Sequence, residues 1–217
     1  MTASTNTPAS STGVGAAALR AYVYLDRMQP NWTAYVAQTS QDNPPAAGMA
    51  QLYIEVYPAT LVFPLANEAL KNTDTQSSML VAERQFGTLE LHADDPDAVK
   101  QAGAIILDRI GVASAPATAP TSVVSHVVSN VTDAEAQLVN KMRVANLLIE
   151  DEAMLVLEVA PAAYTALAAN EAEKHTELRL ILVSLHGASG RLILSGSQAD
   201  VDIGHTIVMN VLDAVES

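Results

Sequence analysis

Residues 52–73, LYIEVYPATLVFPLANEALKNT, recur as residues 155–176, LVLEVAPAAYTALAANEAEKHT, and this repetition decides the fold. Within these two segments every match keeps an offset of 103 residues, and the offset continues downstream to Gly87 and Gly190 before it slips by two near the ends of the copies. A period this long exceeds the repeat unit of a solenoid. It indicates two copies of one domain of about 100 residues.

The repetition divides the chain into four parts. We expect a mobile tail over residues 1–17, which are rich in Ser, Thr, Ala and Gly. The first domain spans 18–110, a Pro- and Ala-rich linker spans 111–120, and the second domain spans 121–217.

Both copies carry the same order of expected elements: a strand, a short helix or loop, a strand, a helix, a hairpin and a last helix. In the first copy these are 20–25, 51–56, a helix to Asn72, 78–82 with 88–93, and 97–110. In the second copy they are 122–128, 154–159, a helix to His175, 178–185 with 191–195, and 201–215. Interleaved strands and helices predict a mixed α/β (α+β) fold, in which helices pack on one sheet per copy.

Three local signals refine this order. Pro58 and Pro161 suit the first turn of a helix, where a missing N–H costs little. Thr132 and Glu135 have the spacing of a capping box. Pro64 falls inside the helix of the first copy, where we expect a kink.

Composition excludes several classes of protein. The 217 residues include 11 Lys and Arg but 24 Asp and Glu, which gives a net charge of −13. This charge argues against a nucleic-acid partner. Without Cys there is no disulfide, zinc–thiolate site or cysteine nucleophile. Hydrophobic residues reach 49% but charged residues only 16%. We therefore expect much of the surface to be covered by other copies of the chain.

Membrane and export signals are also missing from the sequence. No run of 18 apolar residues exists, and the first residues lack the basic and apolar regions of a signal peptide. The expectations are no membrane partner and a cytoplasmic location.

The helix motif Ala-Asn-Glu-Ala-x-Lys occurs twice, each time followed by a strand and a Gly-bearing turn. It comprises Ala66, Asn67, Glu68, Ala69 and Lys71 in the first copy and Ala169 to Lys174 in the second. This pattern resembles the bacterial microcompartment shell domain over nearly all of residues 19–215. Because each copy begins with a strand and ends on a helix, it resembles the circularly permuted, tandem-domain form of that family.

The resemblance implies duplicated ferredoxin-like domains and a homotrimer that imitates a hexamer, as a tile of the shell facet. It implies the chain itself and other shell proteins as partners. Stacked pairs of trimers and contacts with encapsulated enzymes are left open. It also implies that Lys71 and Lys174, with Asn67 and Asn170, lie at the tile edge and pack against a neighbouring tile.

A central pore is the functional site that the resemblance implies, formed by the turn between the two hairpin strands. The residues are Glu83, Arg84, Gln85, Phe86 and Gly87 in the first copy, and His186, Gly187, Ala188, Ser189 and Gly190 in the second. The adjacent Glu83 and Arg84 resemble the gate of one branch of the family. Three like charges around a threefold axis repel, so Glu83 of one chain paired with Arg84 of the next would close the hole.

Catalysis has no support in the residues. The five His lie far apart without metal-ligand spacing, and SLHGASG (184–190) contains no GxSxG elbow. We expect no enzyme, no metal and no cofactor. Two alternatives stay open: a duplicated ferredoxin-like sensor with a small molecule between the copies, and, less supported, an enzyme whose active site lies at that interface.

Overall fold

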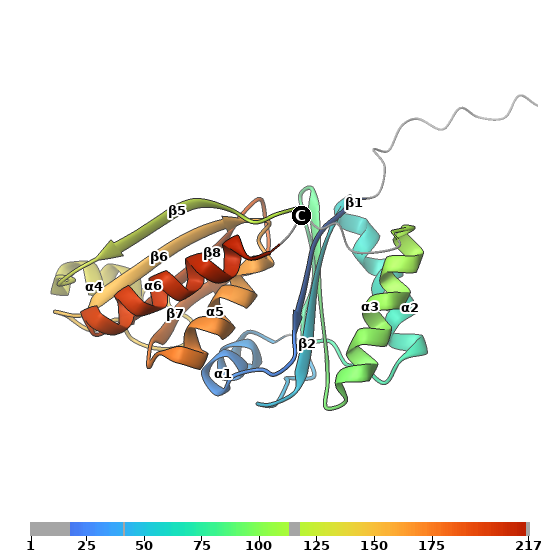
Figure 1. Ribbon diagram of the computed structural model, residues 1–217, viewed down its shortest axis with the longest axis horizontal. Helices are drawn as coiled ribbons and strands as arrows, with labels where there is room; N and C mark the ends of the chain where they lie inside the picture. The colour runs from blue at the N-terminus through green and yellow to red at the C-terminus, as the bar shows by residue number, and fades with distance from the viewer. Residues whose placement is uncertain (1–17, 41, 113–117, 216–217) are drawn as a thin grey trace, which may run out of the picture.

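The computed structural model describes residues 18–40, 42–112 and 118–215. Its core is two four-stranded antiparallel sheets with the strand orders β1-β2-β4-β3 and β5-β6-β8-β7. Figure 1 shows the two sheets in separate halves of the chain, with helices packed on each. The expected mixed α/β fold of two like units is confirmed. The predicted tail 1–17 and residues 113–117 of the predicted linker lie outside the described residues.

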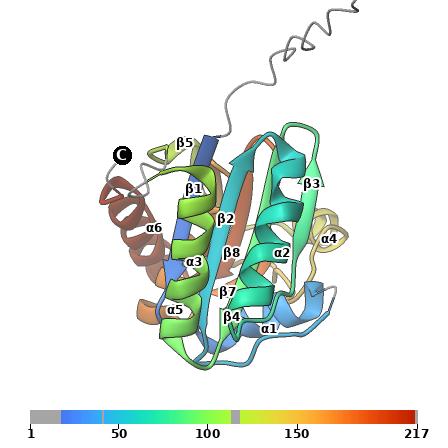
Figure 2. The same ribbon diagram turned by 90° about the vertical axis from the view of Figure 1, so that its right-hand side faces the viewer.

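The first half contains the first sheet and three α-helices. Its elements are β1 (Ala18–Leu25), α1 (Pro30–Thr39), β2 (Ala50–Tyr57), the 3-10 helix η1 (Ala59–Leu61), α2 (Val62–Asn72), β3 (Leu80–Glu83), β4 (Phe86–Ala93) and α3 (Pro96–Ile110). Figure 2 shows α2 and α3 across one face of this sheet.

The second half repeats the order. Its elements are β5 (Thr121–Val128), α4 (Asp133–Asn140), β6 (Ala153–Ala160), α5 (Tyr164–His175), β7 (Arg179–Ser184), β8 (Gly190–Gly196) and α6 (Gln198–Asp213). The strands and long helices agree with the expected ones within a few residues at each end. No described helix is long and apolar enough to cross a bilayer.

The repeat in sequence is a repeat in geometry. Val56 pairs with Gly87 between β2 and β4, and Val159 pairs with Gly190 between β6 and β8. The irregularity between Ser122 and Val124 in β5 lies 103 residues after the one in β1. Positions 103 residues apart therefore occupy equivalent places in the two halves.

Gly87 and Gly190 recur because the backbone passes too close to its neighbour for a side chain. A Cβ at Gly87 would lie 2.2 Å from the carbonyl oxygen of Ala59, and one at Gly190 would lie 2.4 Å from that of Ala162. Each strand thus runs directly against the turn that leads into α2 or α5, and only Gly permits this approach.

Strand alternation gives the first sheet an apolar face and a polar one. Leu52, Ile54 and Val56 of β2 belong to the core under α2 and α3. Residues of the opposite face, Gln51 and Glu55, are fully buried too, although they are polar. Something must cover this second face and satisfy its polar groups.

The cover comes from α1 and the second half of the chain. Trp32 and Tyr35 of α1 share one hydrophobic core with α5 and α6, together with Val23 of β1. Figure 1 shows α1 below the gap between the two halves. On the corresponding face of the second sheet, α4 and the segments that flank it cover a small core that includes Val131, Leu148, Met154 and Ile193.

Local capping explains several helix ends. The Asp95 side chain accepts from Asp97 N at the start of α3, and Gly111 ends that helix in the left-handed region, with φ 84°. Thr132 caps α4 through Glu135 N, as the spacing predicts. Pro64 is the third residue of α2, so it lies in the first turn, where its missing N–H leaves no helical hydrogen bond unmade.

Candidate functional site

The turn of the first hairpin is short. Glu83 ends β3 and pairs with Phe86 of β4, which leaves Arg84 and Gln85 as the two connecting residues. Arg84 has φ 52°, in the left-handed region that tight hairpin turns require. The Glu83 and Arg84 side chains are thus adjacent at the tip of a hairpin.

The turn of the second hairpin is longer. Five residues, 185–189, join Ser184 of β7 to Gly190 of β8. Gly187 has φ 103°, which explains a Gly at this position. The hydroxyl of Ser189 donates to the Glu158 carboxylate of β6, which fastens the turn to its own sheet.

The structure brings the two predicted turns together. The Nδ1 atom of His186 contacts the Oε2 atom of Glu83, 103 residues earlier, in a hydrogen bond that becomes an ion pair when the imidazole is protonated. A small hollow of about 240 Å³ lies between the turns, lined by Glu83 to Phe86, Gly187 and Ala188. Figure 1 shows both hairpin tips at the same side of the molecule.

Arg20 of β1 supports the base of the first turn. Its guanidinium lies 3.6 Å from the centre of the Phe86 ring, a cation–π contact. Its Nε donates to Glu55 Oε1 at 2.7 Å, and the other oxygen of Glu55 accepts from Ala163 N. The turn is therefore linked to the contact between the halves. Neither Arg20 nor Glu55 was predicted from the sequence as part of the site, although Glu55 recurs in the repeat.

The predicted edge residues separate into two groups. Asn170 is fully buried, where its Oδ1 accepts from Gln29 N at 2.9 Å and its Nδ2 donates to Arg27 O. It therefore makes a contact inside the chain. Asn67 and Lys71 are exposed, and Lys174 pairs with Glu171 at 2.5 Å. The tile-edge role of the two lysines stays a prediction.

Helix α1 takes its N-terminal cap from the other half of the chain. It has no side-chain cap of its own, and the carboxylate of Glu173 accepts from Asn31 N and Trp32 N, both at 2.7 Å. The negative charge of this carboxylate also interacts favourably with the positive end of the helix dipole. No local pattern in the sequence indicates this pairing, because the two partners lie more than 140 residues apart.

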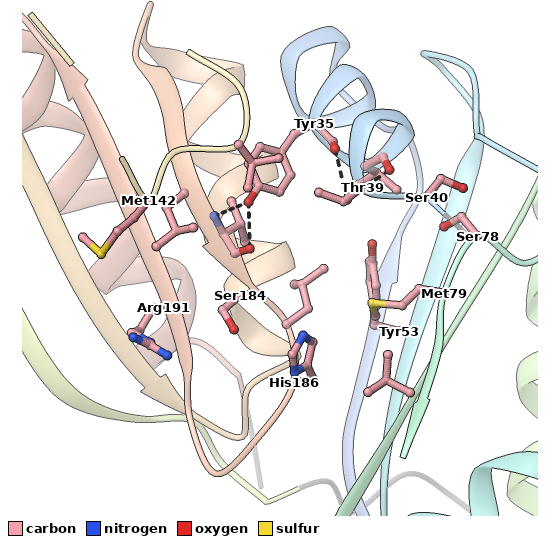
Figure 3. Close-up of a pocket in the computed structure, with 16 residues that line it drawn as sticks. Tyr35, Thr39, Ser40, Tyr53, Ser78, Met79, Met142, Ser184, His186 and Arg191 are labelled. Carbon is pink, nitrogen blue, oxygen red and sulfur yellow. Dashed lines mark hydrogen bonds between the residues drawn. The ribbon is translucent and has the colours of Figure 1, made fainter. Parts of the chain in front are cut away.

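A larger cavity of about 490 Å³ lies between the two halves, lined by residues of α1, β2 and β7 (Figure 3). The Tyr35 hydroxyl donates to Val183 O at 2.8 Å and accepts from Val183 N at 2.7 Å, which satisfies the backbone of this residue on the edge strand β7. Burial raises the pKa of Tyr35, so its hydroxyl stays protonated. The lining mixes apolar side chains with Ser184, His186 and Arg191.

Residues 18–40, 42–112 and 118–215 contain no group of three or more His, Asp or Glu placed to hold a metal ion. His92 contacts the buried Glu90 carboxylate, which also accepts from Ser78 and Gln51. His205 contacts the Ser125 hydroxyl at 2.7 Å.

Similarity to known proteins agrees with this architecture. Residues 19–116 match the family model described as the CsoS1D N-terminal domain. The carboxysome shell protein CcmP of Synechococcus elongatus is 34% identical over 90% of this chain and 92% of its own length. The carboxysome shell protein CsoS1D of Prochlorococcus marinus is 34% identical over 92% of this chain and 78% of its own. The chain belongs to the tandem-domain family of microcompartment shell proteins.

Two solved structures extend the match to the fold. One is a fused permuted hexameric shell protein of the RMM microcompartment, 35% identical, with a TM-score of 0.86 over 91% of this chain and 99% of its own. The other is a double ringed trimeric shell protein of the same compartment, 32% identical, with a TM-score of 0.88 over 92% of this chain and 98% of its own.

These findings decide between the interpretations of the sequence. The resemblance to the permuted, tandem-domain shell proteins is confirmed, and the chain is a structural component of a microcompartment shell. A duplicated small-molecule sensor is not favoured, although a cavity does lie between the copies. CcmP, CsoS1D and the two solved neighbours are all named as shell proteins, and none of the four is named as an enzyme.

Proposed function

We propose that three chains form a ring-shaped shell tile whose centre is a pore lined by the paired turns. One observation carries this: the turn at Glu83 and the turn at His186 meet at one corner of the chain. A threefold axis beside that corner gathers two turns from each of three chains. The ring is then an imitation hexamer built from alternating first and second halves.

The gate of this pore is Glu83 with Arg84. In the isolated chain Glu83 contacts His186 rather than Arg84. In the ring, Arg84 of a neighbouring chain offers Glu83 a second partner. Exchange between these two partners moves a charged side chain into the opening or away from it. In the single chain the His186 and Glu83 side chains are each 42% exposed. Ion pairs this exposed contribute less than about 1 kcal/mol, so Glu83 can exchange His186 for Arg84 of a neighbouring chain at little cost.

The open pore is polar and passes small charged or polar metabolites. Its rim carries a carboxylate, a guanidinium and an imidazole from each chain, together with the Gln85 amide and the Ser189 hydroxyl. Charge and width at such a rim select what crosses, as in other protein channels. The tile acts as a selective wall, without catalytic chemistry of its own.

The tile also joins other components of the shell. Lys71 and Lys174 sit late in equivalent helices and pack against neighbouring tiles at the edge. The double ringed trimeric neighbour motivates a further step, in which two tiles of this protein stack face to face. We assign contact with encapsulated enzymes to residues 1–17.

Electron microscopy of purified protein tests the pore and its gate. Wild-type particles should show a threefold ring and two classes of central density, one closed by Glu83 and Arg84 and one open. Arg84→Ala should lose the closed class, whereas the control Arg143→Ala, an exposed residue beyond α4, should keep both. A ring whose centre is formed by other residues would overturn the proposal.

A further inference from the structure

The contact between the two halves of the chain is built from a few specific hydrogen bonds. Asn170 of α5 holds the backbone ahead of α1 at Gln29 N and Arg27 O. Glu55 of β2 accepts from Ala163 N, in the turn that enters α5. These bonds fix how a first half sits on a second half.

The 103-residue offset gives each of these groups an equivalent on the opposite side of the chain. Asn67 corresponds to Asn170, and Glu158 corresponds to Glu55, with the same residue type in both pairs. Asn130 and Thr132, just ahead of α4, correspond to Arg27 and Gln29. The chain therefore carries both partners of a second contact of the same kind. Its second half carries Glu158, Asn130 and Thr132, and its first half carries Asn67.

Within one chain these two parts are left apart. Asn170 is fully buried, but Asn67 is exposed. Leu138 of α4, which is equivalent to the buried Tyr35, has 64% of its surface exposed, and Leu70 of α2 has 40%. These exposed apolar side chains lie on α4 and α2, whose equivalents α1 and α5 contact each other within the chain. They mark surfaces that a partner covers.

We propose that α4 and the preceding Asn130–Thr132 segment of one chain dock on α2 of a second copy, in the manner of α1 on α5. Asn67 of the second copy accepts from the backbone N–H of Thr132 and donates to the carbonyl of Asn130. Glu158 accepts from the backbone N–H of Thr60, the equivalent of Ala163, at the second copy's η1. This inference rests on the proposed ring, and it names the residues that close it.

The differences between the copies agree with this docking. Glu173 caps α1 because that helix lacks a cap of its own. Leu70, the equivalent of Glu173, cannot accept a hydrogen bond, and α4 has an N-cap of its own in Thr132. Leu70 then meets the start of α4 at Ala134, the equivalent of Asn31, as an apolar contact. Likewise Leu138 replaces Tyr35 and meets Leu80, the equivalent of Val183.

Matched substitutions at equivalent positions separate the two interfaces. Asn67→Ala should raise the protein concentration at which the trimer dissociates by about tenfold or more. The free energy of unfolding of the dissociated chain should stay unchanged. Asn170→Ala should instead lower the stability of the single chain. Sedimentation over a dilution series and chemical unfolding give the two readouts. A trimer unaffected by Asn67→Ala would overturn the assignment.

Crosslinking tests the predicted neighbours directly, since the chain has no Cys. Leu70→Cys with Ala134→Cys, treated with a short bis-maleimide, should give covalent dimers and trimers on a denaturing gel. The matched pair Asn31→Cys with Glu173→Cys should crosslink within the chain and leave its mass on the gel unchanged. Because Leu70 and Ala134 are both exposed in the single chain, the variant with Cys at these two positions should fold normally.

The outcomes separate this inference from the proposed function. A trimer that forms but does not crosslink between positions 70 and 134 would overturn the docking and leave the shell tile intact. A wild-type protein that stays monomeric at every concentration would overturn the tile itself. Crosslinked trimers, together with weakened assembly in Asn67→Ala, support both.

Discussion

The Oε2 atom of Glu55 accepts a hydrogen bond from the backbone N–H of Ala163, 3.1 Å away and 108 residues later in the chain. The other carboxylate oxygen accepts from Arg20 at 2.7 Å. One buried carboxylate therefore joins β1, β2 and the entry to α5. It couples the first half of the chain to the second.

Truncation of this side chain should destabilise the folded chain. Glu55→Ala leaves a buried N–H and a half-buried guanidinium without their acceptor, at a cost of about 1–3 kcal/mol in the free energy of unfolding. Glu55→Gln keeps an acceptor for Ala163 and should lose less. Urea unfolding measures both variants, and equal losses in the two would contradict the hydrogen-bonding role.

The stability contribution of Glu55 should depend on pH. Burial raises its pKa, against the lowering effects of the Ala163 N–H and the Arg20 guanidinium. The folded chain therefore keeps this proton to a higher pH than the unfolded chain. The contribution is fully present below the ordinary carboxyl pKa and declines as the pH rises through the raised value.

Glu55→Gln cannot titrate, which gives the matching measurement. The free energy of unfolding of this variant, minus that of the wild type, should rise as the pH goes from about 4 towards 7. Urea unfolding at a series of pH values measures the difference. A difference that falls over this range would show that the ion pair with Arg20 outweighs burial.

Removal of the Tyr35 hydroxyl should destabilise the contact between α1 and β7. Tyr35→Phe leaves both the N–H and the carbonyl of Val183 without a partner in a buried place, at a cost of about 1–3 kcal/mol. Tyr24→Phe is the control, because the structure gives that hydroxyl no hydrogen bond to a described residue. Amide hydrogen exchange at Val183 should accelerate in the first variant alone.

Gly87 and Gly190 should not tolerate Ala. The added Cβ would overlap a backbone carbonyl oxygen in either case, and backbone at this point cannot move without shifting η1 or the turn into α5. We expect each substitution to cost about 1–3 kcal/mol. A Cβ added at Gly196 would lie 2.9 Å from the tip of the flexible Leu178 side chain, so Gly196→Ala should cost less. Thermal unfolding of the three variants measures the difference.

Loss of the His186 imidazole should favour the closed pore. His186→Ala removes the partner that Glu83 has within its own chain, so that Glu83 pairs with Arg84 of its neighbour more often. Class populations from electron microscopy give the measurement. His175→Ala, an exposed histidine at the end of α5, should leave the populations as in the wild type. An increase in the open class would contradict the exchange of partners.

Much of the fold follows from the sequence because the duplication supports each element twice. The strand at 51–56, for example, is supported by the like segment at 154–159, and the structure extends each by a residue at either end. The expected kink at Pro64 did not allow for the preceding 3-10 helix, which places Pro64 in the first turn of α2. The recurrence of Gly87 was visible, but its cause, a backbone passing nearby, was not.

The site is less accessible to sequence reasoning, because its residues meet only in three dimensions. The family resemblance indicated the turns at Glu83 and His186, yet nothing in the residues showed that the two would touch. The capping of α1 by Glu173 and the link from Arg20 to Phe86 join segments far apart in the chain. Such contacts depend on how the halves dock, which no local pattern encodes.

A single-particle map of the purified assembly tests the central claim most directly, by locating Glu83 relative to the symmetry axis. We predict a threefold ring in which Glu83 and Arg84 of all three chains line the central opening, next to His186. A map in which these side chains lie on the outer rim, or one without threefold symmetry, would contradict it.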